Sequence, residues 1–474
     1  MADFSPLRFH GQAKAALADP VLRENFRGAM DYLRDKRREA FPDPAEETAV
    51  RDAAEQIRQR CLSKLPALLE LLEANCKKNG IQVHWAVDGA EANRIILDIA
   101  KRHAAPTVVK GKSMVSEEVG LNHEMARHGV NCLETDMGEF IVQLDGDTPS
   151  HIIMPAIHKN KQEVSDTFAA NLDGFTPTTD VDSLIQTGRR VLREHFRTAR
   201  MGLSGVNFAV AETGTLCLLE NEGNGRMCTT VPKVHVAITG IEKVVEWLAD
   251  VPPLYSAVTR SAIGQRITTY FNMINGPRRE GELDGPDEVH LVLLDNGRSQ
   301  AYRDEELIKT LQCIRCGACM NHCPVYTRIG GHAYGTVYPG PIGKIISPHL
   351  LGLEQTSDLV TASTLCGACA DVCPVRIPIP DLLQRLRHDA KHQALKAHEP
   401  LRGQGVAGSR IEKMAMGGFA FAATHPRLYH TAAGMAGKLR GLMPSNLGPW
   451  TSCREAPKPA PVSLNQIMRR RKEK

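Results

Sequence analysis

Seven of the thirteen cysteines lie between positions 313 and 373, in two runs of the same spacing. The first run reads Cys313-Ile-Arg-Cys316-Gly-Ala-Cys319-Met-Asn-His-Cys323-Pro324, and the second reads Cys366-Gly-Ala-Cys369-Ala-Asp-Val-Cys373-Pro374, fifty positions later in the same register. Two-residue spacers let the backbone wrap three corners of a cubane cluster, and the fourth cysteine of such a run ligates the other cluster of a pair. The spacing therefore predicts two [4Fe-4S] clusters.

Crossed ligation divides the seven thiolates into two sets. The first cluster is assigned Cys313, Cys316, Cys319 and Cys373, and the second is assigned Cys323, Cys366 and Cys369. The second set lacks one thiolate, because the position equivalent to Cys313 is Ser363. Three explanations stay open: a hydroxyl or water ligand on the fourth iron, a [3Fe-4S] cluster, or a cysteine from elsewhere in the fold or from a partner chain.

Two other uses of paired cysteines fit this spacing less well. Zinc is saturated by four ligands, so it has no use for a repeated C-x-x-C-x-x-C run that continues to a further cysteine and a proline. A thioredoxin-like pair would need a single C-x-x-C at a helix start. We expect most of the remaining cysteines to be small buried hydrophobic residues; they are Cys61, Cys76, Cys132, Cys217, Cys228 and Cys453.

The composition is that of a globular protein with more than one domain. A length of 474 residues predicts roughly two to four domains, and 42% hydrophobic residues suffice for packed cores. The first ten residues contain no apolar run of a secretory signal or membrane anchor, so we expect a cytoplasmic protein. A net charge of +4 is too small to indicate nucleic-acid binding.

The first three segments of the chain differ in pattern. Residues 1–75 are charge-rich with helical periodicity and predict a helical lead-in. Residues 76–300 alternate short β-branched runs with amphipathic helices, which predicts a parallel-sheet α/β domain with one of its strands at His151-Ile-Ile-Met154. Residues 301–395 carry the cysteine runs, with helices expected after Pro324 and Pro374. The Gly- and Pro-rich stretch 330–343 is expected to form a loop outside the core.

Two further segments complete the chain. Residues 396–445 predict a helical segment whose apolar patch, 414–423, suits a partner interface, a membrane surface or plain packing. Residues 446–474 are rich in Pro, Ser and Lys, which predicts a disordered tail with a basic end, Arg469 to Lys472. Together these features allow a peripheral contact with the inner face of the cell membrane.

Two segments resemble nucleotide-binding motifs, but both motifs are incomplete. Lys110-Gly-Lys-Ser113 resembles the end of a P-loop, yet Pro106 stands where its first glycine belongs. Gly223-Asn-Gly225 begins like a dinucleotide fingerprint but places Cys228 at the third small position. Iron–sulfur clusters pass single electrons and accept no hydride. The chain should therefore need a partner that handles the substrate and an acceptor such as a carrier or a quinone pool.

Several longer motifs are similar to the LUD (lactate utilization) domain: Lys110–Glu118, Glu134–Leu144, Pro149–Lys159 and Ala211–Arg226. Joined to the cysteine runs, they resemble the lactate utilization protein B family over about residues 60 to 450. The resemblance implies a cluster-bearing subunit of a three-part, non-flavin system that oxidises L-lactate to pyruvate. It also implies a LUD fold like that of sugar-phosphate isomerases and CoA-transferases (NagB/RpiA/CoA-transferase-like), followed by an α-helical ferredoxin-type domain with two [4Fe-4S] clusters.

The leading hypothesis is an electron-transfer subunit, with cluster potentials set by backbone amides near Gly317 and Gly367, by burial, and by charges such as Arg315 and Arg376. The alternative is a LUD-domain enzyme acting on an acyl or phosphorylated small molecule, with structural or redox-sensing clusters. In it, Glu220 and Glu222 would share one strand face. Its candidate residues are Lys110, Lys112, Ser113, Glu118, Glu212, Thr213, Glu220 and Glu222.

Overall fold

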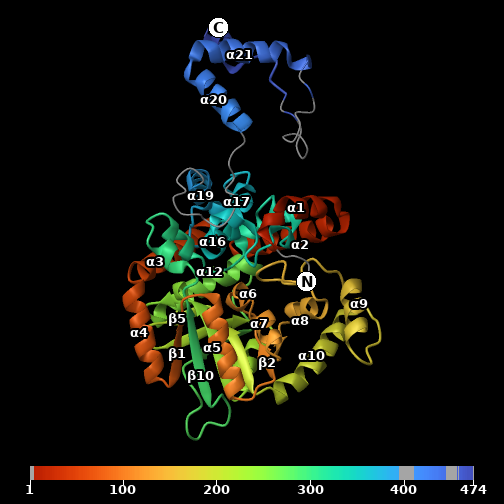
Figure 1. The fold of residues 1–474 in the computed structure, drawn as a ribbon, viewed down its shortest axis with the longest axis vertical. Coiled ribbons are helices and arrows are strands. Elements are labelled where there is room, and N and C mark those ends of the chain that lie inside the picture. Colours follow the sequence, from red (N-terminus) through yellow and green to blue (C-terminus); the bar gives the residue numbers. More distant parts are fainter. Residues whose placement is uncertain (1–4, 394–409, 443, 445–455, 457, 473–474) are drawn as a thin grey trace. The chain divides into compact units, whose positions relative to one another are not determined.

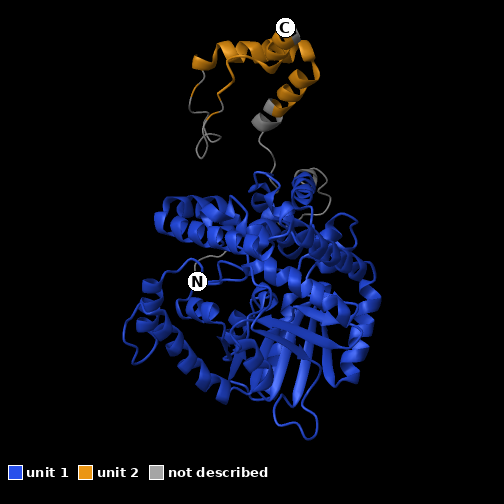
Figure 2. Ribbon diagram, turned by 180° about the vertical axis from the view of Figure 1, so that it is seen from behind, with its two compact units in different colours: residues 1–405 blue, residues 406–474 orange. Residues whose placement is uncertain are grey.

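The computed structural model describes residues 5–393, 410–442, 444, 456 and 458–472. The chain divides into two compact units, Met1–Gly405 and Val406–Lys474, which are coloured separately in Figure 2. The first unit contains the α/β sheet and both cysteine runs. The second contains the C-terminal helices.

The chain begins with helices, as the periodicity predicts. They are η1 (Pro6–Arg8), α1 (Phe9–Ala18), α2 (Pro20–Ala40), α3 (Pro44–Ser63) and α4 (Leu65–Lys78). Asp19 and Asp43 accept hydrogen bonds from the first free amides of α2 and α3, and a proline follows each cap, where its missing N–H costs nothing. These helices therefore start where the sequence places a cap and a proline together.

A six-stranded, fully parallel sheet forms the centre of the first unit (Figure 1), which confirms the prediction of a parallel α/β fold. Its strand order is β1-β10-β7-β4-β2-β3. The strands span Ile81–Ala86 (β1), Thr107–Lys110 (β2), Asn131–Glu134 (β3), Met201–Gly205 (β4), Val234–Gly240 (β7) and Glu288–Leu294 (β10). Because all six run the same way, their carboxyl ends meet at one edge, where open α/β sheets place their functional groups.

A smaller sheet and a set of helices accompany the parallel sheet. The second sheet has the order β8-β5-β6-β9, with β5 Phe208–Val210, β6 Thr215–Glu220, β8 Val244–Val245 and β9 Tyr270–Ile274. The helices are α5 (Gly89–Arg102), α6 (Met114–Glu118), α7 (Leu121–Arg127), α8 (Met137–Leu144), α9 (Lys161–Asn171), α10 (Val181–Thr198), α11 (Asn224–Thr230), α12 (Val251–Ile263) and α13 (Arg298–Tyr302), with short turns η2 (Ile241–Lys243) and η3 (Leu248–Asp250).

The strand predicted at His151-Ile-Ile-Met154 does not form, and these residues bend instead. The Nδ1 atom of His151 accepts hydrogen bonds from the amides of Ile153 (3.0 Å) and Met154 (3.1 Å). A side chain that binds the amides two and three residues ahead turns the chain and competes with a strand ladder. The strand prediction was wrong because it was based on the β-branched residues of this segment. It did not include the hydrogen bonds from the backbone to the His151 side chain.

The cysteine-bearing segment is a series of short helices. They are η4 (Leu307–Gln312), α14 (Ala318–Asn321), α15 (Tyr326–Ile329), η5 (His332–Tyr334), α16 (Gly340–Leu351), α17 (Leu353–Thr361), α18 (Ala368–Asp371) and α19 (Ile379–Gln393). The loop expected at 330–343 is wrong in part, since Tyr334 and Tyr338 are buried and α16 begins at Gly340. A Cβ atom at Gly331 would lie 1.8 Å from the Ser150 carbonyl oxygen. Glycine here permits a close approach to the α/β domain.

One hydrophobic core joins the three parts of the first unit. It contains Phe26 from α2, Leu72 from α4, Leu291 from β10, Tyr326 from α15 and Leu383 from α19. The rings of Phe26 and Tyr326 meet edge to face at 5.6 Å. The helical lead-in, the sheet and the cysteine-bearing segment thus bury their apolar surfaces against one another.

The second unit comprises α20 (Arg410–Thr424), α21 (Pro426–Lys438), η6 (Arg440–Leu442) and α22 (Leu464–Lys472). Helix α22 lies in the tail that was expected to be disordered. Ser463 and Gln466 form reciprocal side-chain-to-backbone hydrogen bonds at its start, which is the geometry of a capping box. Met414, Met416, Phe419 and Phe421 are exposed on α20. Among the described helices, none combines the length and apolarity needed to cross a membrane.

Candidate metal centre

The two cysteine runs adopt the same backbone turns. Arg315 (φ 61°) and Gly317 (φ 76°) are left-handed in the first run, and Leu365 (φ 54°) and Gly367 (φ 86°) are left-handed in the second, fifty positions on. A left-handed non-glycine residue costs roughly 1–2 kcal/mol. Each run contains one such residue, Arg315 or Leu365. In the first run, this turn directs the amide of Arg315 to the Cys313 sulfur, at 3.4 Å.

The four cysteines assigned to the first cluster lie together and are buried. Cys313, Cys316, Cys319 and Cys373 are at most 8% exposed. Burial raises the pKa of Cys316 to about 12, and the negative charges of Cys373 and Cys313 add to the effect. The structure thus brings Cys373 of the second run beside the first run. Its sulfur accepts a hydrogen bond from the amide of Ile377 at 3.4 Å.

The three cysteines assigned to the second cluster also gather, nearer the surface. Burial raises the pKa of Cys369 to about 11, and the charge of Cys323 from the first run contributes in the same direction. Cys366 is exposed, and the amide of Ala368 lowers its pKa. Burial raises the pKa of Cys319, and the charge of Cys369 acts in the same direction, so the two groups are neighbours.

Ser363 stands where a fourth thiolate of the second group would be expected. Its Oγ atom accepts a hydrogen bond from the amide of Leu365 at 3.2 Å, just as the Cys313 sulfur accepts one from Arg315. Arg387 donates to the Ser363 carbonyl at 3.1 Å. The serine therefore occupies the same turn as its cysteine counterpart and presents an oxygen there.

The remaining cysteines behave as small core residues. Five of them are buried, as predicted: Cys61, Cys76, Cys132, Cys217 and Cys228. Burial raises the pKa of Cys217 to about 12, which keeps its thiol protonated and unreactive. Cys453 lies outside the described residues.

The arrangement of the sulfurs suits a cluster better than a single zinc ion. In tetrahedral zinc with Zn–S bonds of about 2.3 Å, the sulfurs lie about 3.8 Å apart. Throughout the described part of the chain, no three cysteine sulfurs fall within 4.8 Å of one another. Buried thiols in like-charge contact ionise only when cations share the site. Soft thiolates in this number are the usual ligands of iron–sulfur clusters.

Two arginines, Arg58 and Arg315, lie near Cys313 of the first group. Arg58 is 1% exposed and donates to the carbonyls of Leu311 (2.9 Å) and Gln312 (3.3 Å), so it fixes the chain just before Cys313. Arg315 pairs with Glu242 at 3.2 Å, and its guanidinium lies 4.7 Å from the Tyr338 ring centroid.

The second arginine considered for tuning is placed differently. Arg376 pairs with Asp52 and Glu55 on α3, and its side chain is 31% exposed. It is an ion-paired residue at the protein surface. Of the two, Arg315 is the less exposed, with a side chain that is 12% exposed, and its charge is balanced by Glu242.

Sequence reasoning missed a contact between the α/β domain and the first cysteine run. The Nδ1 atom of His151 accepts two amides, so its Nε2–H donates to the Asn321 side-chain oxygen at 3.0 Å. Burial lowers the pKa of His151 to about 4. Tyr326 donates to the Ser150 carbonyl at 2.7 Å. The only sequence signal was a histidine standing alone in an apolar run.

The candidates for a LUD-domain enzyme divide among separate structural roles. Lys110 is fully buried at the end of β2 and pairs with Glu134 (2.5 Å) and Glu117 (2.9 Å). Ser113 caps α6. Lys112 donates to the Ile153 carbonyl. These residues secure the carboxyl edge of the sheet.

Two of the carboxylate candidates, Glu220 and Glu222, lie near each other at the end of β6, because the charge of Glu220 acts on Glu222. Strand β6 ends at Glu220, which accepts the amides of Gly225 and Arg226, both at 2.6 Å. Glu222 lies beyond the strand and accepts the amide of Met137 at 3.0 Å, so the expectation of a shared strand face is wrong. Burial, then the charge of Asp136, raises the pKa of Glu222 to about 7.

The other three candidates are also held by structural contacts. Glu212 accepts the amide of Leu248 at 2.9 Å. The Thr213 hydroxyl donates to Thr215 at 2.8 Å. Glu118 is enclosed by Asn296, Arg298 and Tyr338.

Comparison with known proteins matches three family profiles along the chain. They are the LUD domain at residues 69–294, the 4Fe-4S dicluster domain at 309–377, and "Lactate utilisation protein B, C-terminal" at 385–473. A solved structure of a DUF162 family protein from Deinococcus radiodurans matches 48% of this chain and 98% of its own, at 13% identity and a TM-score of 0.27. That score is too low to support a comparison of folds.

Curated relatives match over most of their length. "Uncharacterized electron transport protein YkgF" of Escherichia coli (strain K12) is 42% identical over 89% of this chain and 86% of its own. "Lactate utilization protein B" of Exiguobacterium sp. is 40% identical over 98% of this chain and 97% of its own. The protein of that name from Bacillus subtilis (strain 168) is 40% identical over 89% and 85%. The chain therefore belongs to the lactate utilization protein B family, with a LUD domain followed by a 4Fe-4S dicluster domain.

Proposed function

We propose that this chain is the iron–sulfur electron-transfer subunit of an L-lactate-oxidising system that yields pyruvate. The observation that carries the proposal is the pair of adjacent cysteine groups, each built from both runs. The names of its relatives, which refer to lactate utilization and electron transport, support the same assignment. When bound, clusters at these cysteines supply one-electron carriage, so a hydride-handling partner must meet the substrate.

The proposed ligands follow the grouping of the sulfurs. Cys313, Cys316, Cys319 and Cys373 hold the first [4Fe-4S] cluster, and Cys323, Cys366 and Cys369 hold the second, with Ser363 facing its fourth iron. Amides of Arg315 and Ile377 donate to the sulfurs of the first set, which favours the thiolate form. Arg58 holds the backbone in place just before the first ligand.

The two cysteine groups differ in solvent exposure, and this difference indicates the direction of electron transfer. The first group is buried beside the sheet edge, whereas Cys366 of the second group is exposed. Electron transfer to another molecule favours the group that the other molecule can approach closely. We therefore place the exchange with the electron acceptor, a carrier or the quinone pool, at the second group.

A basic cleft lies beside the loop that carries Cys323. It measures about 660 Å³ and is lined by four arginines (Arg23, Arg27, Arg34, Arg328), two acids (Glu24, Asp31) and four other residues (Pro20, His322, Pro324, Thr327). Among the described residues, neither Arg23 nor Arg328 has an ion-pair partner. Unpaired cations at a cleft attract and orient anionic partners. The cleft is thus proposed to dock the acidic face of an electron carrier.

Small redox probes test the cleft without the natural partner. The reduced, cluster-loaded protein is oxidised with anionic ferricyanide or with cationic hexaammineruthenium(III). Arg23→Glu with Arg328→Glu should slow the first reaction several-fold and accelerate the second, with both effects shrinking at high salt. Equal effects on both oxidants would show that the cleft does not guide electron exchange.

The whole proposal is tested by titrating the anaerobic protein with L-lactate, first alone and then with the other subunits of the three-part system. We expect bleaching of the cluster absorbance only when the partners are present. Pyruvate formation by the isolated chain would instead identify it as an enzyme. We also propose that the LUD part has a fold like that of sugar-phosphate isomerases and CoA-transferases. A peripheral membrane contact through the second unit is a further proposal.

A further inference from the structure

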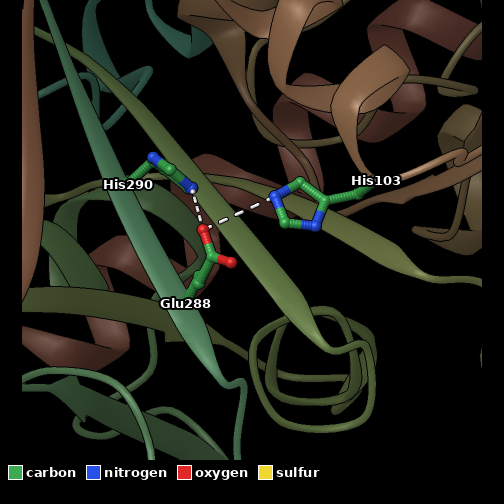
Figure 3. A group of neighbouring side chains, drawn as sticks. All are labelled: His103, Glu288 and His290. Atoms are coloured by element: carbon green, nitrogen blue, oxygen red, sulfur yellow. Dashed lines mark ion pairs between the residues drawn. The ribbon is translucent and has the colours of Figure 1, made fainter.

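Two histidines and one glutamate converge at the amino end of strand β10 (Figure 3). Glu288 is the first residue of β10, His290 lies two residues on, and His103 directly follows helix α5. Because the sheet is parallel, this edge is opposite to the carboxyl edge, where Glu242 meets the cysteine-bearing segment. The cluster therefore lies outside the electron-transfer site.

The spacing of the three side chains matches that of metal ligands. The Nε2 atoms of His103 and His290 each lie 3.4 Å from the same Glu288 oxygen, and all three ligand atoms fall within 4.8 Å of one another. Ligands at about 2.0–2.1 Å from a tetrahedral zinc ion lie about 3.4 Å apart. A small inward shift of His103, the more exposed of the two histidines, would close the set around one ion.

The surroundings of His290 also favour a metal. The His290 side chain is fully buried. Its Nδ1 atom lies 3.1 Å from Nε2 of His84, while its buried Nε2 atom has no hydrogen-bond partner. If Nδ1–H donates to His84, the Nε2 lone pair faces Glu288. An outer hydrogen-bond partner that fixes the tautomer of a ligating histidine is typical of metal sites.

The site is open on one side. The Glu288 side chain is 39% exposed and that of His103 is 25% exposed, so an ion can enter from solvent and keep a water ligand. A second trio, Asp147, His158 and His332, is a weaker candidate, because the Nε2–H of His332 donates to the Thr148 carbonyl at 2.6 Å. Its nitrogen is already used.

We propose that His103, Glu288 and His290 bind one divalent transition-metal ion of the zinc class, with water as the fourth ligand. The ion would tie the end of α5 to the start of β10 and would have no part in electron transfer. Two histidines with one carboxylate form a donor set that zinc favours. The site is independent of the proposed lactate role, and either can fail without the other.

Zinc binding to the full-length, cluster-loaded protein tests the proposal, since the cluster cysteines are then occupied. Equilibrium dialysis with zinc should show one bound equivalent. His103→Ala and Glu288→Gln, both at partly exposed positions, should weaken binding at least tenfold. His128→Ala serves as the matched control, because His128 pairs with Glu124 at 3.2 Å without a third ligand; its uptake should equal that of the wild type.

Zinc K-edge absorption identifies the ligands without interference from iron. We expect a nitrogen and oxygen shell at about 2.0–2.1 Å with the scattering pattern of two imidazoles. A sulfur shell at about 2.3 Å would place the zinc on cysteines and overturn the proposal. No zinc uptake, or equal uptake by the wild type and both folded variants, would also overturn it and leave an ordinary ion pair.

Discussion

Arg298 holds Glu118 at two points: Nη1 lies 2.8 Å from Oε1 and Nη2 lies 2.8 Å from Oε2. Both side chains are 3% exposed. Tyr338 donates to the same carboxylate at 2.8 Å, and Arg298 also pairs with Glu242 at 2.5 Å. The pair therefore joins α6, the start of α13 and the cysteine-bearing segment in one buried network. Glu118, a candidate for catalysis on sequence grounds, is a structural residue.

Glu118→Gln should destabilise the fold strongly, because it leaves the buried Arg298 without half of its counter-charge. Breaking a buried ion pair costs about 3–5 kcal/mol. The melting temperature of the cluster-loaded protein measures the loss. Glu124→Gln removes an exposed pair with Arg127 and should cost less than about 1 kcal/mol. Equal shifts for the two variants would mean that the network contributes little.

Cys316→Ser should remove the first cluster. The iron content of anaerobically prepared protein should fall by about four irons, because the variant loses one of the four thiolates proposed to hold the first cluster. Lactate-dependent growth should be lost with it. Cys76→Ala, a buried cysteine in α4 outside both runs, should keep its iron. Growth that survives the loss of the cluster would refute the relay.

Ser363→Cys should complete the thiolate set of the second cluster. Low-temperature electron paramagnetic resonance should then show a changed signal for one cluster only. Iron content near eight is expected for the variant; a wild-type value near seven would identify an incomplete site. Ser363→Ala removes the oxygen while keeping the turn. Spectra identical in all three proteins would show that position 363 does not face the cluster.

His235 makes stability depend on pH. Its side chain is fully buried beside Ser204, and burial, then the charge of His290, lowers its pKa to about 3. Below about pH 6.5 the unfolded chain binds a proton that the folded chain excludes. The free energy of unfolding should therefore fall as the pH drops from 6.5 toward 3, by up to about 1.4 kcal/mol per pH unit.

The measurement compares melting temperatures at pH 7.5 and 5.5 in zinc-free buffer. The wild type should lose more stability between these values than His235→Gln, which has no proton to gain. Parallel losses in the two proteins would show that His235 is not responsible for the pH dependence.

Local signals in the sequence predicted much of this structure. The parallel sheet followed from β-branched runs such as Val289–Leu294, and the helical lead-in followed from the periodicity of segments such as Pro20–Leu33. Spacing alone also suggested that Cys373 joins the first run, and the structure brings it there. In each case the pattern and its physical cause lie within a few residues, or in a repeated spacing.

Features that depend on distant partners were missed. The turn at His151 forms because its ring reaches the next amides while its other nitrogen meets Asn321, far along the chain. The stretch at Gly331 looked like a loop because its burial depends on Ser150. Glu118 looked reactive because its partners, Arg298 and Tyr338, are remote in sequence. Tertiary contacts gave these residues their roles.

The common core of the first unit links iron supply to the lifetime of the protein. Tyr326 lies three residues after Cys323 and packs on Phe26 in the same core as Leu291 of the central sheet. If the cysteine turns bind clusters as proposed, a molecule that lacks them would lose support for that core and open more often. Cellular proteases degrade opened chains. Iron starvation or oxygen damage would thus lower the amount of this protein in the cell. Folded but inactive molecules would not accumulate.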